Sequence, residues 1–438
     1  MLDKFLFKQI DNSSLIVFRV IFGLLCFLES VGAIFTGWVK KTLIDPEFTF
    51  NFIGLDFLQP LPGNWMYAYY VIMGLFGLGI MLGYKYRLSI ISFTIMWSAT
   101  YFMQKASYNN HYYLLILLCG IMAILPANKY ASIDVKTKPS LKSISMPSWC
   151  KWIFVIQLFI VYTYASVAKI YPDWLDLTTP KLLMEGKRHL PIIGEFLQND
   201  FMPYLVGYGG ILYDGLIIPL LLFKPTRKLA FYGSLFFHLF NSIVFQVGIF
   251  PFLALAFSLF FFESKKIRNI FLKKKTLYTG NEISVKSYKL ILIGLGLVYF
   301  TIQIILPVRH HFIKDNVLWT EEGHRLSWRM MLRSKQGATF YKIKNHTKDS
   351  TFRVNLNDYL TRKQQRLAST KPDVMWQFSQ HLKEEHKQKG DSISVYITSS
   401  LSVNRKAYKK FTNPDIDIAN QEWNYFGHAS WLLPYNSN

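Results

Sequence analysis

The stretch SLIVFRVIFGLLCFLESVGAIFTGW, residues 14–38, contains only two charged side chains, Arg19 and Glu29. A helix needs about 20 predominantly apolar residues to cross a bilayer, so this stretch is long enough for one crossing. Eight further apolar runs follow, near 66–84, 88–104, 111–127, 151–170, 203–223, 229–248, 249–263 and 288–307. The pattern predicts a polytopic α-helical membrane protein with about nine transmembrane helices. We expect the first run to remain as a signal anchor, because no small-residue cleavage site follows it.

The composition of the 438-residue chain agrees with this class. Charged residues make up 17% of the chain, against about 25% in ordinary soluble domains. Lys and Arg outnumber Asp and Glu by 49 to 27, a formal net charge of +22. With nine crossings and a cytoplasmic N-terminus, the inner segments hold twenty basic and five acidic residues, and the outer loops hold six and eight. This asymmetry follows the positive-inside rule, so the basic excess supports the topology with a cytoplasmic N-terminus. We therefore expect no nucleic-acid partner.

The composition of the sequence changes near residue 308, where charged residues become frequent again and apolar runs become shorter. Residues 392–397 alternate as a half-buried strand does, and residues 357–389 read as a polar helical stretch. We therefore predict two parts: a transmembrane domain over 1–307 and an extracytoplasmic α+β domain over 308–438.

Several familiar sites are missing from the sequence. There is no phosphate-binding G-x-x-x-x-G-K-[ST] loop, no H-E-x-x-H and no C-x-x-C-H. The pairs His310-His311 and His381/His386 have no partner at the usual spacing, so we expect no metal site. The three cysteines contain no C-x-x-C pair, so neither a disulfide framework nor a zinc finger is expected; they are Cys26, Cys119 and Cys150.

Six ionisable side chains fall inside the predicted spans or at their ends. Such groups are costly in a bilayer and are functional candidates by default. They are Arg19, Glu29, His111, Lys169, Asp214 and His238. For Arg19, Glu29 and Asp214 we favour a structural role in pairing with neighbouring spans.

His111 opens the fourth predicted span and Lys169 closes the fifth, so an antiparallel pair of helices brings both to the outer face. By position alone, Lys169 reads equally well as a snorkelling lysine, and His111 as a polar helix start. The surrounding segments, SYNNHYY (107–113) and YTYASVAKIYPDW (162–174), are rich in polar and aromatic side chains. They favour a functional site over a snorkelling lysine and a polar helix start. An amine in an apolar pocket loses hydration and becomes a base or a nucleophile. Such a site suits a lipid-soluble weak acid.

Several stretches together resemble the vitamin K-dependent γ-glutamyl carboxylases and their bacterial relatives, which share the HTTM membrane domain. They are NNHYY (109–113), ASVAKIYPDWL (165–175), FHLFNS (237–242) with GIF (248–250), WT (319–320) with SWRMM (327–331), and NPDIDI (413–418) through Trp423 to Ser430-Trp431. Because these widely spaced stretches occur in the same order, the resemblance extends from near the start of the chain to its end.

The resemblance implies a reaction and its site. Lys169 would be the amine base that deprotonates vitamin K hydroquinone, or menaquinol in a bacterial host. The hydroquinone reacts with O2 to an epoxide, and the strong base formed on the way removes a γ-proton from a peptide glutamate, which takes up CO2. His111 would position or stabilise the reacting glutamate or its carbanion. Quinol-binding residues would be Asn110, His238 and Asn241.

The resemblance further implies a loop that presents the glutamate, and no metal. Its residues would be Trp319, Thr320, His324, Trp328, Met330 and Met331. The partners would be a glutamate-containing peptide or protein and the lipid bilayer. Keeping water from the strong base explains a site at membrane depth.

Three departures from the family pattern leave an alternative open. Ala168 stands where animal enzymes have a second lysine, and His324 stands where the glutamate loop has a tyrosine. The extracytoplasmic part is also shorter than in animal enzymes, so we expect no recognition through a propeptide. The leading interpretation is a carboxylase of a bacterial inner membrane, rather than of the endoplasmic reticulum. The alternatives are a quinol epoxidase without glutamate carboxylation and a non-enzymatic quinol-binding membrane protein.

Overall fold

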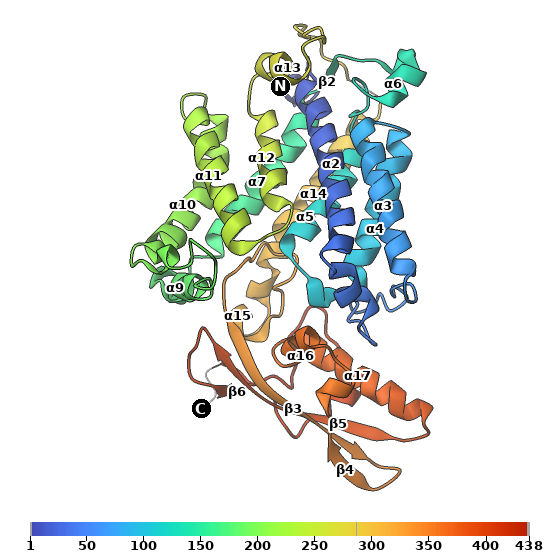
Figure 1. Ribbon diagram of the computed structural model, residues 1–438, viewed down its shortest axis with the longest axis vertical. Coiled ribbons are helices and arrows are strands. Elements are labelled where there is room, and N and C mark those ends of the chain that lie inside the picture. The colour runs from blue at the N-terminus through green and yellow to red at the C-terminus, as the bar shows by residue number, and fades with distance from the viewer. Residues whose placement is uncertain (1, 286, 436–438) are drawn as a thin grey trace.

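The computed structural model describes residues 2–285 and 287–435, and it shows a helical bundle with a smaller appendage at one end (Figure 1). The apolar helices of the bundle are α2 (Ser13–Phe35), α3 (Trp65–Leu82), α4 (Tyr86–Met103), α5 (Asn110–Ile124), α7 (Trp149–Val167), α10 (Met202–Leu222), α11 (Arg227–Phe245), α12 (Phe250–Phe257) and α14 (Lys289–Val308). Each lies at one of the predicted runs.

Six helices in the described part of the chain are long and apolar enough to cross a membrane. They are α2, α3, α7, α10, α11 and α14, the last continued to Phe312. α5 and α12 are shorter, and α4 is not among the six. A multi-pass membrane protein is therefore confirmed, whereas nine crossings and their orientation stay predictions.

Short elements connect the bundle helices. They are α1 (Leu2–Leu6), β1 (Gln9–Asp11), α6 (Ile133–Thr137), β2 (Ser145–Pro147), α8 (Pro172–Leu175), α9 (Thr178–Glu185) and α13 (Ser264–Phe271). β1 and β2 pair antiparallel, with Ile10 opposite Met146, and this pairing ties the start of the chain to the segment before α7.

Glycines let α2 and α3 approach each other closely. A Cβ on Gly23 would lie 2.2 Å from the backbone nitrogen of Met81, and one on Gly77 would lie 2.7 Å from that of Phe27. Small residues at a helix contact are the usual means of close packing inside a membrane. Either glycine replaced by a larger residue would force the two helices apart.

The charged side chains of α2 have hydrogen-bond partners inside the bundle. The buried Arg19 guanidinium donates to four backbone carbonyls, among them Ala131 at 2.6 Å and Ala127 at 3.1 Å. Glu29 accepts a hydrogen bond from the Tyr112 hydroxyl at 2.5 Å. These bonds join α2 to its neighbours, as an intramembrane charge requires.

The appendage is an α+β unit, as predicted. A four-stranded antiparallel sheet has the order β4-β3-β5-β6, and helices α16 and α17 lie between it and the bundle (Figure 1). The elements are α15 (Val317–Thr320), β3 (Lys335–Asn345), β4 (Ser350–Arg353), α16 (Arg362–Ala368), α17 (Pro372–Gln388), β5 (Ile393–Val403) and β6 (Lys409–Lys410). Val395 and Ile397 of β5 are buried against Phe378 of α17, which explains the alternation in the sequence. The domain boundary at 307/308 remains a prediction.

A buried ion-pair network joins the appendage to the bundle. Asp373, in the first turn of α17, binds Lys105 Nζ at 2.7 Å and also the Arg325 guanidinium. Lys105 lies between α4 and α5, and its side chain is 1% exposed. Burial lowers the pKa of Lys105 to about 8, against the opposing charge of Asp373. Although burial acts the other way, the charges of Arg325 and Lys105 hold the pKa of the Asp373 carboxyl well below its usual range.

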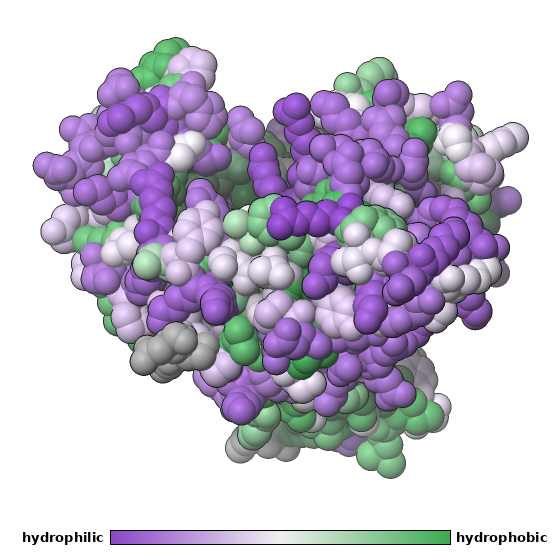
Figure 2. Space-filling model, turned by 90° about the horizontal axis from the view of Figure 1, so that it is seen from below, coloured by the Kyte–Doolittle hydropathy of each residue, from purple (hydrophilic) through white to green (hydrophobic). Residues whose placement is uncertain are grey.

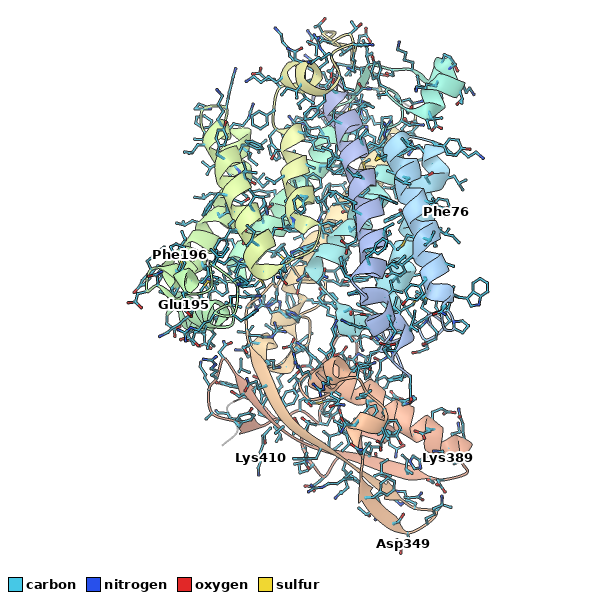
Figure 3. The ribbon with its side chains drawn as sticks, viewed as in Figure 1. Phe76, Glu195, Phe196, Asp349, Lys389 and Lys410 are labelled. Carbon is cyan, nitrogen blue, oxygen red and sulfur yellow. The ribbon has the colours of Figure 1, made fainter. Side chains whose placement is uncertain are left out.

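Replacing Asp373 with asparagine is expected to destabilise the protein by about 3–5 kcal/mol, because two buried cations lose their shared carboxylate. Denaturant unfolding in detergent would measure the change in the free energy of unfolding. The control is Glu195→Gln, which removes a 3.8 Å pair with Arg188 whose side chains are 65% and 82% exposed (Glu195 in Figure 3). That change should cost at most about 1 kcal/mol. Equal stability of both variants would contradict an anchoring role for Asp373.

Candidate functional site

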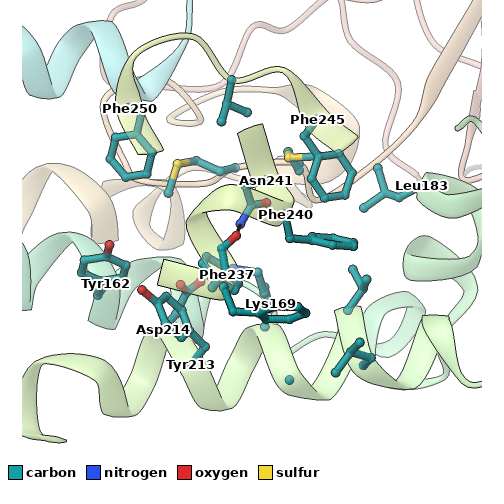
Figure 4. Close-up of a pocket in the computed structure, with 18 of the residues that line it drawn as sticks. Tyr162, Lys169, Leu183, Tyr213, Asp214, Phe237, Phe240, Asn241, Phe245 and Phe250 are labelled. Carbon is teal, nitrogen blue, oxygen red and sulfur yellow. Dashed lines mark hydrogen bonds and ion pairs between the residues drawn. The ribbon is translucent and has the colours of Figure 1, made fainter. Parts of the chain in front are cut away.

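An apolar cavity of about 290 Å³ lies among α7, α10, α11, α12 and the first turn of α5 (Figure 4). Its wall is rich in aromatic side chains, namely Tyr162, Trp174, Tyr213, Phe236, Phe237, Phe240, Phe245 and Phe250. Four further polar or charged side chains reach it: His111, Lys169, Asp214 and Asn241. A concave apolar wall with few convergent polar groups is the usual form of a small-molecule site.

Lys169 sits just beyond the end of α7, where the chain turns away. The backbone of Tyr171 is extended, and Pro172 starts α8. A residue that precedes proline disfavours the helical conformation, which agrees with this turn. Lys169 Nζ lies 2.5 Å from Asp214 Oδ2 and donates to the Ala165 carbonyl at 2.9 Å. The two charged side chains are 11% and 8% exposed. The structure therefore places a buried ion pair in the cavity wall.

His111 reaches the cavity from the first turn of α5. Asn109 caps this helix, because its side chain accepts a hydrogen bond from the Tyr112 backbone N–H at 2.7 Å. The His111 ring stacks on Phe250, with ring centroids 4.1 Å apart and planes at 19°. Within the described chain neither ring nitrogen has a hydrogen-bond partner, so the imidazole is available to a ligand.

Besides its aromatic wall residues, helix α11 supplies one polar residue to the cavity and one histidine behind the wall. Asn241 lines the cavity, and its amide nitrogen donates to the Phe237 carbonyl at 2.9 Å. His238 Nε2 lies 3.0 Å from the Tyr162 hydroxyl and 3.1 Å from the Tyr213 hydroxyl. His238 thus fixes two tyrosines that line the cavity and is not itself among the lining residues.

The loop that follows α15 has a strained backbone. Four non-glycine residues have positive φ: Glu321 at 64°, Leu326 at 59°, Trp328 at 56° and Met331 at 55°. This conformation costs an L-residue roughly 1–2 kcal/mol. Strain of this kind persists only where surrounding contacts enforce it, and it collects at functional sites.

Residues at the start of α5 hold this loop in place. The Leu326 N–H donates to the Tyr108 hydroxyl at 2.6 Å, and Asn110 Nδ2 donates to the Arg329 carbonyl at 3.1 Å. Trp328, which is 1% exposed, stacks on Tyr113 with centroids 5.0 Å apart. The clamped loop brings Met330 and Met331 into the wall of the apolar cavity.

A second cavity, of about 380 Å³, shares part of this wall. His111, Val247, Met330 and Met331 line both cavities. The second cavity adds polar groups, including Asn110, His324 and Arg329. His111 therefore stands between an apolar space that contains an amine and a more polar space beside the appendage.

The structure brings together only some of the predicted site residues. His111, Lys169, Asn241, Met330 and Met331 line the apolar cavity, and Asn110 and His324 line the second. Trp328 lines neither and packs in the bundle core. Trp319 and Thr320 are buried in the appendage, where Trp319 Nε1 donates to the Leu433 carbonyl at 2.9 Å. The predicted binding roles of these residues stay predictions.

Sequence reasoning assigned Asp214 a structural pairing and missed its partner. We expected Lys169 to meet His111 because their helices are joined by a short connection. In the structure, α7 packs most extensively against α10, which carries Asp214, and α10 and α11 supply most of the cavity wall. A lone acidic residue in the apolar run of α10 was the available signal.

Two protein families match this chain. The HTTM domain matches residues 7–265. The vitamin K-dependent gamma-carboxylase, lumenal domain, matches residues 288–438, a range that includes α14. No solved structure matches the chain significantly.

Proposed function

Because this chain belongs to the vitamin K-dependent gamma-carboxylase family, we propose that it carboxylates peptide glutamate at the γ-carbon, with reduced vitamin K as co-substrate. In a bacterial host the co-substrate would be menaquinol. The observation that carries the proposal is the buried Lys169–Asp214 pair in an aromatic cavity that His111 also lines. The site residues and the reaction are assigned on this geometry and on the family together.

The apolar cavity fits the ring system of a naphthoquinol. Flat aromatic walls such as Phe237 and Phe250 suit stacking, and the side-chain carbonyl of Asn241 can accept a hydrogen bond from a quinol hydroxyl. Oxidation of the bound hydroquinone by O2 to the epoxide would supply a base stronger than any side chain. Such a base is needed because no side chain ionises a γ-carbon acid directly.

Lys169 is proposed to take the hydroxyl proton of the quinol at Nζ. This role requires the neutral form of the amine, which has two N–H groups, and the Ala165 carbonyl and the Asp214 carboxylate accept from this nitrogen. The lone pair is then left for the incoming proton. Asp214 stabilises the resulting ammonium, which has no bulk water around it.

His111 is proposed to act on the glutamate. It lines both the quinol-sized cavity and the second cavity, so a glutamate in the second cavity meets an imidazole without other partners. A neutral imidazole N–H donates to a carboxylate or to a developing carbanion. The mobile, apolar side chains of Met330 and Met331 exclude water from the shared wall.

The proposed arrangement in the membrane places the N-terminus in the cytoplasm and the appendage outside. The transmembrane domain over 1–307 would hold the chemistry, and the domain over 308–438 would receive the peptide. The positive-inside asymmetry supports this orientation. We propose the bacterial inner membrane as the location.

One reaction tests the proposed function. Purified protein in detergent receives reduced naphthoquinone, O2, isotopically labelled bicarbonate and a glutamate-rich peptide. Mass spectrometry then scores epoxide and labelled peptide. Both products establish the carboxylase, whereas epoxide alone supports the second candidate, a quinol epoxidase, for which His324 in the loop is the favouring observation. If folded protein forms neither product, both candidate functions are refuted.

Asp214 should act as a positioning residue for Lys169. Asp214→Asn is expected to lower kcat for epoxide formation about 10–100-fold, because the amine loses its fixed partner, while KM for quinol changes less than about threefold. Asp214→Glu should retain more activity than Asn. The control is Asp200→Asn, at an exposed site without an ion-pair partner in the described chain. An unchanged kcat, or a rise in KM alone, would count against this role.

A further inference from the structure

A third cavity, of about 660 Å³, lies in the appendage between the 329–337 segment and α16. We call it the basic cavity, because six of the described residues that line it are basic and none of them is acidic. The basic residues are Arg329, Arg333, Lys335, Arg362, Arg366 and Lys371. It shares His324, Arg329 and Met331 with the second cavity. The two spaces therefore lie side by side.

The positive charge of the basic cavity is only partly balanced within the protein. The buried Glu321 carboxylate binds Arg333 and also Lys335 at 3.2 Å and Lys371 at 2.6 Å. One carboxylate thus serves three cations. A fourth, Arg329, is 9% exposed, and its Nε has no partner in the described chain.

Two further cations at the rim are free. Arg362 and Arg366 are exposed on consecutive turns of α16, and no acidic group pairs with either one in the described part of the chain. Their guanidinium groups have the planar donor geometry that binds carboxylates in bidentate fashion.

The basic side chains of this cavity lie close together, and the nearby negative charge does not balance them. Burial, together with the nearby charge of Arg333, lowers the pKa of Lys371 to about 7, although Glu321 opposes this. Burial likewise lowers the pKa of Lys335 to about 8. An anion placed among these groups would stabilise their protonated forms.

We propose that the basic cavity binds carboxylates of the peptide substrate other than the one that reacts, so that the enzyme favours peptides with clustered acidic side chains. The inference rests on the proposed function for the reacting glutamate. Because the basic and second cavities share a wall, a peptide with one glutamate in the second cavity presents its neighbours to the basic one.

Two observations favour a peptide over a lipid headgroup as the source of these carboxylates. All lining residues of the basic cavity fall within 324–371, so none belongs to a membrane-spanning helix. The end of the molecule that carries the appendage is also largely hydrophilic, as Figure 2 shows from below. A soluble acidic segment reaches this face more readily than a bilayer surface does.

Binding without turnover tests the proposal. A fluorescent peptide with one central glutamate is flanked either by glutamates or by glutamines, and anisotropy with the purified full chain in detergent gives each Kd. The glutamate-flanked peptide should bind at least about tenfold more tightly. Arg362→Glu combined with Arg366→Glu should remove most of that difference and change the glutamine-flanked Kd less than twofold. The matched control is Arg353→Glu with Lys410→Glu, which changes net charge equally at exposed sites outside the cavity (Lys410 in Figure 3).

Every outcome decides the proposal. Equal Kd values for the two peptides, or an equal loss in the control variant, would overturn it, since either shows that no specific site reads the flanking charge. Displacement of the peptide by phosphatidylglycerol in mixed detergent micelles would assign the cavity to lipid and would also overturn the proposal. Because binding needs no chemistry, charge-dependent binding without labelled product would refute the proposed carboxylation alone.

Discussion

Lys169→Ala is expected to abolish quinol epoxidation, with a loss of at least about 1,000-fold in kcat. General-base catalysis typically contributes about 10²–10⁴-fold, and among the described residues no amine other than Lys169 lines this cavity. The measurement is epoxide formed per enzyme under saturating quinol and O2. Carboxylated peptide should vanish in parallel, because the base that attacks the glutamate is made only during epoxidation.

Small amines added in solution should restore part of the epoxidation by the alanine variant. The truncated side chain leaves space beside Asp214, which can hold a small ammonium or amine in place of Nζ. The control is Lys181→Ala, at an exposed lysine of α9 outside the apolar cavity, which should keep full activity. If the folded Lys169→Ala protein responds to no amine, a base role is contradicted.

His111→Ala is expected to separate the two halves of the reaction. Carboxylated peptide should fall at least about 100-fold, because the glutamate loses its hydrogen-bond donor, while epoxide formation stays within a few fold. The ratio of labelled peptide to epoxide in one reaction mixture measures this uncoupling directly.

An exposed histidine serves as the control for that experiment. His189→Ala, in the segment after α9, lies outside the apolar and second cavities and should leave the ratio unchanged. Equal loss of both products in His111→Ala would instead place this imidazole in the quinol step, which its stacking on Phe250 also permits.

The membrane class followed directly from the sequence, because a hydrophobic run of sufficient length is a local property. Each apolar run contains a helix, and the alternation at 392–397 corresponds to β5. The packing partners of the helices could not be predicted from the sequence, because hydropathy does not show which helix faces meet. The principal neighbour of α7 is α10, so Asp214 reaches Lys169 from 45 positions further along the chain.

The candidate site was predictable at Lys169, where the surrounding sequence favoured a functional amine over a snorkelling side chain. A lysine in a polar and aromatic surround at a span end predicted a buried amine, and the structure places Lys169 in a cavity wall. Trp319 and Trp328 were less predictable, because a tryptophan serves equally as a binding surface and as a core side chain. The positive φ values of the 321–331 loop depend on anchors such as Tyr108, and no short motif reveals them.

The two adjacent residues that begin α5 make different contacts. Asn110 holds the Arg329 carbonyl of the loop that follows α15, while His111 lines the apolar cavity. A ligand that shifts this single helical turn therefore changes both spaces at once, which is the physical basis of thermodynamic linkage. Reciprocity then requires that if quinol occupancy raises affinity for peptide, peptide raises affinity for quinol by the same factor. An enzyme so built would consume reductant and oxygen chiefly when an acceptor is present, and would limit futile oxidation.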